Sequence, residues 1–247
     1  MLDVHDSWIS PDWPCPPSVR ALVTTRTGGV SSGSFASLNL GDSVGDDPDN
    51  VAENRQRLQT RLPSPPRWLR QVHGNVVVDA AQVTMPVAAD GSVATGAATV
   101  CAVMAADCLP VLLCDRAARV VAAAHAGWRG LCSSVLENTV QAMRTTPGEL
   151  MAYLGPAIGP DAFEVGDEVL AAFVEQDPQA ASAFRKHLKG KWFADLFMLA
   201  RQRLRAAGVT SVYGGTDCTY SDPARFFSHR RDKVSGRMAA LIWITDT

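Results

Sequence analysis

The segment DCLPVLLCDRAARVVAAAHAGWRG, residues 107–130, decides how the rest of the chain is interpreted. Two apolar runs, 110–114 and 119–124, flank a polar stretch that can turn, and glycines after His125 are typical of a loop that opens a helix. The pattern predicts strand, turn, strand and helix. Because an antiparallel hairpin brings its two open ends together, we expect Cys108 and His125 to be close neighbours.

A thiolate beside an imidazole has two chemical uses. The pair is either half of a site for a soft metal or a nucleophile with its general base. A third interpretation, a buried cysteine near a core histidine, is equally compatible with this segment alone, since free cysteines are commonly buried. The rest of the chain has to decide between the three.

Composition excludes several classes of protein. The 247 residues are 47% hydrophobic and 19% charged with a net charge of −2, which allows a sizeable core and gives no electrostatic case for nucleic acid or an anionic membrane as partner. The sequence shows no signal peptide and no apolar run of the ~20 residues that span a bilayer. Six cysteines without a CxxC pair indicate reduced thiols, so we expect a cytoplasmic protein.

Strands and helices are predicted to alternate unevenly, with no internal repeat and no linker. We therefore expect one domain over residues 1–247, of the mixed α/β (α+β) class with a layered sheet. Helix starts follow from features such as Asp47 before Pro48. Helices are expected over 48–62, 131–144, 164–174 and 192–207, and strands over 19–25, 99–105, 150–154, 209–213 and 237–245, with two short strands around His73 within 68–79.

Three predicted strand ends carry metal-binding side chains: His73, Cys108 and His125. Two histidines and one cysteine with an open fourth position form a catalytic zinc pattern. The signature of the zinc deaminases that act on nucleobases, HxE with PCxxC, is absent. Taken singly, His73 is better explained as a hydrogen-bonded turn residue than as a ligand. A long Gly/Ser loop over 26–41 contains Arg26 and Asn39 among small residues, which suits close approach to a ligand. The loop taken alone is better explained as a flexible surface hairpin.

Several motifs together resemble the YfiH/laccase-domain family. The resemblance extends over nearly the whole chain and implies a single cytoplasmic domain with a YfiH-like mixed β-sheet sandwich flanked by helices. It also implies a zinc site at His73, Cys108 and His125. The motifs are TTRTGGVS (24–31), RQVHG (70–74), ADCLPVLL (106–113), AAAHAGWRG (122–130), CTYSDPARFFSHRRD (218–232) and GRMAALIW (236–243).

The family is described as purine nucleoside phosphorylases that act on adenosine, inosine and methylthioadenosine, with an adenosine deaminase activity. The resemblance thus implies a purine nucleoside and phosphate as partners of a monomer or homodimer.

For the phosphate we predict Arg26 and Arg129, because a guanidinium is a bidentate oxyanion partner and Arg129 lies at a predicted helix start. Asn39 is predicted to bind either the phosphate or a ribose hydroxyl. The alternative role for Arg129 is that of a structural salt-bridge residue. Arg231 and Arg237 are weaker candidates for binding the phosphate. Asp107 is a candidate proton carrier or an orienter of the metal ligands.

Members of the family are also described as copper-binding polyphenol oxidases and as peptidoglycan-editing factors. A four-copper site needs many histidines in His-x-His pairs, and this chain has five histidines with no such pair (His5, His73, His125, His187 and His229). Weak oxidation at a copper-substituted site stays open, because Cu²⁺ outcompetes Zn²⁺ for such ligands.

Two further alternatives involve the same residues. In a cysteine hydrolase acting on peptidoglycan precursors, Cys108 attacks, His125 or His73 is the base, and Asp107 or Asp90 orients it. In a scaffold protein, the zinc is structural and needs a fourth protein ligand, for which Cys218 is the best candidate.

Overall fold

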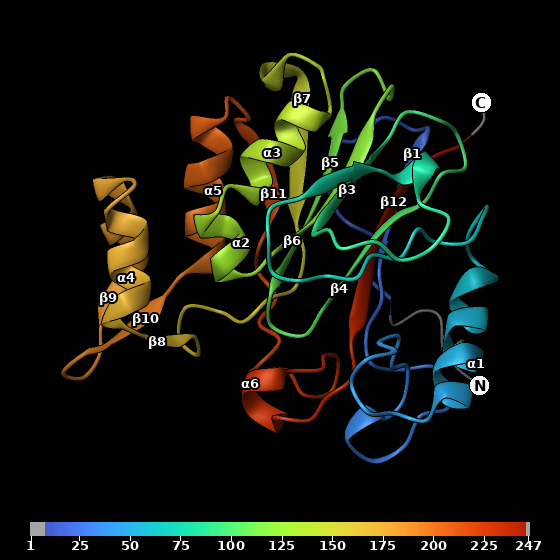
Figure 1. Cartoon of the computed structure of the whole chain (residues 1–247), viewed down its shortest axis with the longest axis horizontal. Coiled ribbons are helices and arrows are strands. Elements are labelled where there is room, and N and C mark those ends of the chain that lie inside the picture. The colour runs from blue at the N-terminus through green and yellow to red at the C-terminus, as the bar shows by residue number, and fades with distance from the viewer. Residues whose placement is uncertain (1–7, 246–247) are drawn as a thin grey trace.

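Two β-sheets packed face to face form the centre of the structure (Figure 1). The computed structural model describes residues 8–245, so His5 lies outside the described part. The sandwich predicted from the sequence is confirmed. The larger sheet has the order β11 (Ser211–Gly214), β7 (Leu150–Leu154), β5 (Leu109–Asp115), β6 (Val121–Ala126), β3 (Gly91–Ala94) and β2 (Val77–Asp79), and the smaller has β1 (Val19–Val23), β12 (Met238–Ile244) and β4 (Cys101–Ala105).

The central strand β5 explains why its sequence is apolar without alternation. Val111 and Leu113 belong to the core on the helical side, whereas Leu112 and Cys114 belong to the core between the two sheets. All residues of β5 are buried because both faces of the strand are covered. A strand of this kind has no solvent-facing position that needs a polar side chain.

Helices cover the outer face of each sheet. α2 (Trp128–Cys132), α3 (Val135–Ala142) and α5 (Leu196–Ala206) share a core with the larger sheet. α1 (Pro48–Gln59) covers the smaller sheet through Leu58, and it begins where the Asp47 carboxylate accepts the amide of Asp49. Among residues 8–245, no helix is long and apolar enough to cross a membrane.

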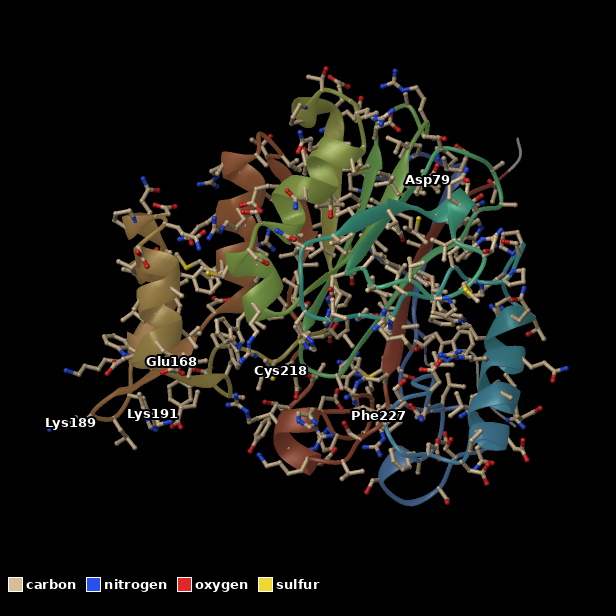
Figure 2. All side chains as sticks on the ribbon, viewed as in Figure 1. Asp79, Glu168, Lys189, Lys191, Cys218 and Phe227 are labelled. Carbon is tan, nitrogen blue, oxygen red and sulfur yellow. The ribbon has the colours of Figure 1, made fainter. Side chains whose placement is uncertain are left out.

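A third, small sheet lies at one edge of the molecule with α4 (Asp167–Val174) beside it (Figure 1). Figure 2 shows Glu168, Lys189 and Lys191 in this outlying part, away from Phe227 near α6 (His229–Asp232). Its strands are β8 (Glu164–Gly166), β10 (Lys191–Ala194) and β9 (Phe184–Lys186).

This sheet corrects two sequence predictions. The helix expected from residue 192 begins only at Leu196, because Trp192 pairs with both neighbouring strands and the Asp195 carboxylate caps the helix by accepting the amide of Met198. The helix expected from residue 164 begins at Asp167 because the preceding residues form β8.

Two other predicted elements are interrupted. The helix expected over 131–144 is split into α2 and α3, because Ser134 has φ of 73°. Of the two strands expected around His73, only the second forms, as β2. Residue His73 has φ of 59° and lies in a loop, so the first strand was a wrong prediction.

Candidate metal centre

The open end of the β5–β6 hairpin brings Cys108 and His125 together, as the sequence predicted. The antiparallel register places Pro110 opposite His125 and Leu109 opposite Ala126. Cys108 directly precedes β5, so the pairing of the strands carries its side chain to the histidine.

His73 completes the group from a separate loop. One ligand atom from each of His73, Cys108 and His125 lies within 4.8 Å of the others, and among residues 8–245 this is the only such group of three or more His, Cys, Asp or Glu residues. The two imidazole rings meet edge to face, with their centroids 4.8 Å apart. His125 is buried, Cys108 is half-buried and His73 is exposed, so the group is open on one side.

The carboxylate of Asp90 holds both histidines in place. It accepts the amides of Val72, His73 and Gly74 at 3.1, 2.9 and 2.7 Å, which fixes the His73 loop. It also lies 2.8 Å from Nδ1 of His125, so the Nε2 atom is left for a ligand. Burial alone would raise the pKa of Asp90, but these hydrogen bonds and the neighbouring imidazole lower it. Carboxylate–histidine contacts of this kind orient metal ligands.

The charges of Cys108 and His125 depend on each other. Burial raises the pKa of the Cys108 thiol, but the charge of His125 and hydrogen bonds from both histidines bring it down to about 6. Burial lowers the pKa of His125, but the Cys108 thiolate and Asp90 raise it to about 9. The site thus favours a thiolate, which is the form that binds metals and attacks electrophiles.

Gly127 leaves room for this group. A Cβ atom at this position would lie 2.8 Å from the sulfur of Cys108 and 3.3 Å from Cδ2 of His73. Any other residue at position 127 would therefore push a ligand out of place.

The metal-binding group opens into a cavity of about 830 Å³. Its walls come from segments that are distant in sequence, including the loop of Gly41 and the residues directly before β5. They are rich in arginine and carry few other charges. The lining residues include Gly41, Asp42, Arg55, Trp68, Arg70, His73, Met104, Asp107, Cys108, His125, Trp128, Arg129, Phe163, His229, Arg230 and Arg237.

Of the residues predicted to bind phosphate, the structure places Arg129 and the weaker candidate Arg237 in the wall of this cavity. Arg129 is exposed and its guanidinium lies 4.4 Å from the ring centroid of Trp128. Arg26 is not among the lining residues. Its Nε donates to the carbonyl of Ala36 at 2.8 Å, and its guanidinium covers Phe227 (labelled in Figure 2).

Asn39 is fully buried beside the cavity wall and does not line the cavity. Its Oδ1 accepts the amides of Gly41 and Arg237, both at 2.9 Å, and its amide group donates to the Asp46 carboxylate. The contacts of Asn39 are therefore those of a residue that holds two wall segments together.

Asp107 lines the cavity, and its carboxylate is engaged on both oxygens. Oδ1 accepts the hydroxyl of Thr219 at 2.7 Å and Oδ2 accepts the amide of Arg230 at 2.6 Å. Cys218 does not belong to the metal-binding group, and its sulfur instead accepts the amide of Gly159 at 3.2 Å. The fourth ligand that a closed structural site would need is therefore not supplied by Cys218.

Sequence reasoning gave too little weight to Asp90 and Arg237. Asp90 was considered only as an orienter in the hydrolase alternative, and its position directly before a strand, in Ala89-Asp90-Gly91, was the available signal. Arg237 was ranked low because nothing nearby in sequence connects it with Cys108. Both residues reach the site only through sheet pairing and loop contacts.

Residues 20–245 match a family model described as multi-copper polyphenol oxidoreductase laccase. The chain belongs to this family. This laccase-family chain is 53% identical over 242 residues to a purine nucleoside phosphorylase of Pseudomonas aeruginosa, a match that covers 98% of the chain and 100% of the relative. It is also 53% identical over 239 residues to the purine nucleoside phosphorylase YfiH of Escherichia coli, covering 96% and 98% respectively.

Solved structures of family members share the fold. A protein of Neisseria meningitidis superposes with a TM-score of 0.96 at 53% identity, covering 97% of this chain and 100% of that one. YlmD of Geobacillus stearothermophilus has a TM-score of 0.90 at 34% identity, covering 97% and 96%. The mixed α/β architecture is therefore that of the YfiH-type proteins.

Proposed function

We propose that this laccase-family chain is a metal-dependent purine nucleoside phosphorylase acting on adenosine, inosine and methylthioadenosine, with adenosine deamination as a second activity. The observation that carries the proposal is the opening of the His73–Cys108–His125 group into an arginine-rich cavity. A volume of about 830 Å³ accommodates a nucleoside together with phosphate. The names of the relatives from Pseudomonas and Escherichia support the substrate class.

The donor set fits zinc. Two imidazoles and a thiolate with one open side are the ligands of a catalytic zinc site, and Asp90 supplies the orienting contact that such sites have. When bound there, zinc would supply Lewis acidity and an activated water. Copper has an affinity for the same donors and is the alternative metal.

The protein's own side chains provide charge and position. In phosphorolysis a phosphate oxygen bonds to the anomeric carbon while the carbon–nitrogen bond breaks, and the purine leaves with the electron pair and takes up a proton. The role proposed for Arg129 is to hold the phosphate dianion at the exposed side of the cavity. Asp107 lines the cavity, and its carboxylate accepts hydrogen bonds from Thr219 and Arg230. These bonds support a positioning role for Asp107 more than a role in proton transfer.

The direct test is incubation of the zinc-loaded protein with adenosine or inosine, with and without phosphate, followed by chromatography. We expect phosphate-dependent release of adenine or hypoxanthine and slow conversion of adenosine to inosine, all lost in His125→Ala. Arg129→Ala should raise the KM for phosphate about tenfold, since a charged hydrogen bond contributes roughly 1.5–3 kcal/mol. Absence of both free base and inosine would overturn the proposal.

One observation favours a second candidate function, a cysteine hydrolase of peptidoglycan precursors. Cys108, His125 and Asp90 are connected in the order nucleophile, base and orienting carboxylate, and the pKa of Cys108 is lowered to about 6. The metal separates the candidates, because a thiolate bound to zinc is not a free nucleophile. Hydrolysis of a muropeptide amide by metal-free protein, without nucleoside cleavage by the zinc form, would select the hydrolase.

A copper-dependent polyphenol oxidation is a third candidate activity of the same residues, suggested by the name of the family model. It would appear only after copper loading. The location that we propose is the cytoplasm, because all six cysteines are free thiols.

A further inference from the structure

We infer that Arg237 forms an inner oxyanion subsite of the cavity, which binds a phosphoryl group through guanidinium nitrogens that no protein group occupies. The inference rests on the proposed function for the identity of the anion, inorganic phosphate or the sugar phosphate formed from it. The structure itself supplies the position of the subsite.

The guanidinium of Arg237 is engaged through one nitrogen only. Its Nη1 donates to the carbonyls of Ser235 and Gly236 at 2.8 and 3.0 Å. Among residues 8–245, its Nε and Nη2 have no hydrogen-bond acceptor. The guanidinium is thus anchored at one nitrogen and has two nitrogens left, the arrangement that binds an oxyanion in bidentate fashion.

Two neighbouring arginines, Arg231 and Arg55, are largely occupied. Arg231 donates through all three nitrogens, to the carbonyls of Thr219, Tyr220 and Phe226 and to its neighbour Asp232. Arg55 is used in a different way, because it bonds to the Leu40 carbonyl, pairs with Asp42 and stacks on Trp68, 4.8 Å from the ring centroid.

Arg230 is half-buried as well, and only one nitrogen of its guanidinium is engaged: Nη1 donates to the Glu164 carbonyl, and the group lies 5.3 Å from the ring centroid of Phe163. Arg70 and Arg129 are exposed and belong to the outer part of the cavity wall.

Arg230 and Arg237 are therefore the two half-buried guanidinium groups of the wall that each keep two nitrogens as donors for a ligand. We assign the subsite to Arg237 because the charges of Cys108 and Asp107 act on it.

The surroundings of Arg237 place it at the inner part of the cavity. Burial lowers its pKa, while the charges of nearby Cys108 and Asp107 raise it, so the guanidinium lies within electrostatic reach of the metal-binding group. A half-buried cation with unused donors is costly when no anion satisfies it. An oxyanion in the cavity would supply those acceptors.

Two other residues fix the position of Arg237. Asn39 accepts its backbone amide at 2.9 Å, and the amide of Leu40 donates to its carbonyl at 3.1 Å. Gly41 packs against the side chain, because a Cβ there would lie 2.8 Å from Cγ of Arg237. Asn39, predicted from the sequence to touch phosphate or ribose, is accordingly proposed to act as a positioning residue for Arg237.

The test compares Arg237→Gln and Arg237→Lys with wild type. Binding of inorganic phosphate is measured by calorimetry, and the KM values for phosphate and inosine are measured separately. We expect Arg237→Gln to raise the Kd and the KM for phosphate at least tenfold, with the KM for inosine and the zinc content within twofold of wild type. Lysine should restore part of the loss, because it keeps the charge without the fork. Arg205→Gln, an exposed change of equal charge on α5, is the control.

Two arms guard against indirect effects. Phosphate binding is also measured in Cys108→Ala, where binding through zinc is removed and the contribution of Arg237 should remain. Gly41→Ala keeps the guanidinium of Arg237 but should shift its position, because the new Cβ would lie 2.8 Å from Cγ of Arg237. This variant should raise the KM for phosphate by an intermediate factor.

The outcomes separate the inference from the proposed function. Wild-type phosphate affinity in Arg237→Gln, in a protein that carries out phosphorolysis, overturns the subsite alone. Phosphate binding that depends on Arg237, in a protein that cleaves no nucleoside, supports the subsite and overturns the phosphorylase. Wild-type protein that binds no phosphate overturns both.

Discussion

The two ends of the β5–β6 hairpin each depend on a buried carboxylate, but they use it differently. At the closed end, Asp115 accepts the amides of Arg119 and Val120 at 2.6 and 3.1 Å and the Nε atom of Arg119 at 2.7 Å. These partners are four or five residues away in sequence. Asp115 therefore stabilises its own turn.

At the open end, Asp90 is as buried as Asp115, but its partners are 16 to 35 residues away. It connects the loop of His73 with the strand of His125. The same chemical group thus closes a turn at one end and assembles a metal-binding site at the other. The comparison teaches that the distance in sequence between the partners, not the type of bond, separates a structural carboxylate from one that serves a site.

The largest effect is expected from removing the ligand at the open end. Cys108→Ala should eliminate metal, whereas wild-type protein purified without added metal should contain about one zinc per chain by elemental analysis. Cys132→Ala is the matched control. Its half-buried thiol is bonded only within the helical layer, so this variant should keep its zinc. Zinc retained in Cys108→Ala would show that the metal binds elsewhere.

The comparison itself is tested by neutralising each carboxylate in turn. Asp90→Asn should lower zinc affinity about 10- to 100-fold, because an amide cannot accept from His125 and the loop amides as a carboxylate does. Asp115→Asn removes the same charge at the other end and should leave zinc affinity unchanged. Competition with a zinc-binding dye measures both. Equal affinities in the two variants would refute the assigned difference.

A smaller effect is expected from crowding the ligands without replacing one. In Gly127→Ala the new Cβ would lie 2.8 Å from the Cys108 sulfur, so the sulfur has to move and zinc affinity should fall several-fold. Gly148→Ala is the control, since a Cβ there meets nothing within 4 Å. Retention of wild-type affinity in Gly127→Ala would mean that the ligand group tolerates this displacement.

The smallest effect concerns stability at the closed end. Burial alone would raise the pKa of Asp115, but Arg119 and the two backbone amides lower it. A lowered pKa means that the stabilisation is complete above the unfolded pKa of about 3.9 and is lost as the pH falls through the folded value.

Asp115→Asn should therefore be destabilised by about 1–2 kcal/mol at pH 6, mostly through the backbone amides because Arg119 is largely exposed. The difference from wild type should shrink below about pH 4. Urea unfolding at several pH values measures it, and a difference independent of pH would argue against the charge of Asp115 as the cause.

The sequence predicts well what depends on neighbours in the chain. The hairpin, its apolar strands and the contact between Cys108 and His125 follow from one continuous segment, and the first helix follows from Asp47 before Pro48. These features need only periodicity, turn chemistry and the geometry of a hairpin.

Prediction failed where distant segments determine the conformation. The loop of His73 was wrongly predicted as a strand. The amide of His73 is bonded to Asp90, and only the folded sheet brings this carboxylate to the loop. Trp192 and Phe193 fit a helical period but pair in a strand. Arg26, predicted to bind phosphate, contacts the Ala36 carbonyl and Phe227 and does not line the cavity, so its role in binding stays a prediction.

The bonds of Asp90 have a consequence for hydrogen exchange. Val72 and His73 are exposed residues, yet their amide hydrogens point to a buried carboxylate and are bonded there. Such amides exchange with deuterium only when the loop opens, so their exchange rates measure how often the loop leaves Asp90. The rate of deuterium uptake at residues 72–74 thus measures how often the metal-binding loop opens, and the measurement needs neither substrate nor turnover.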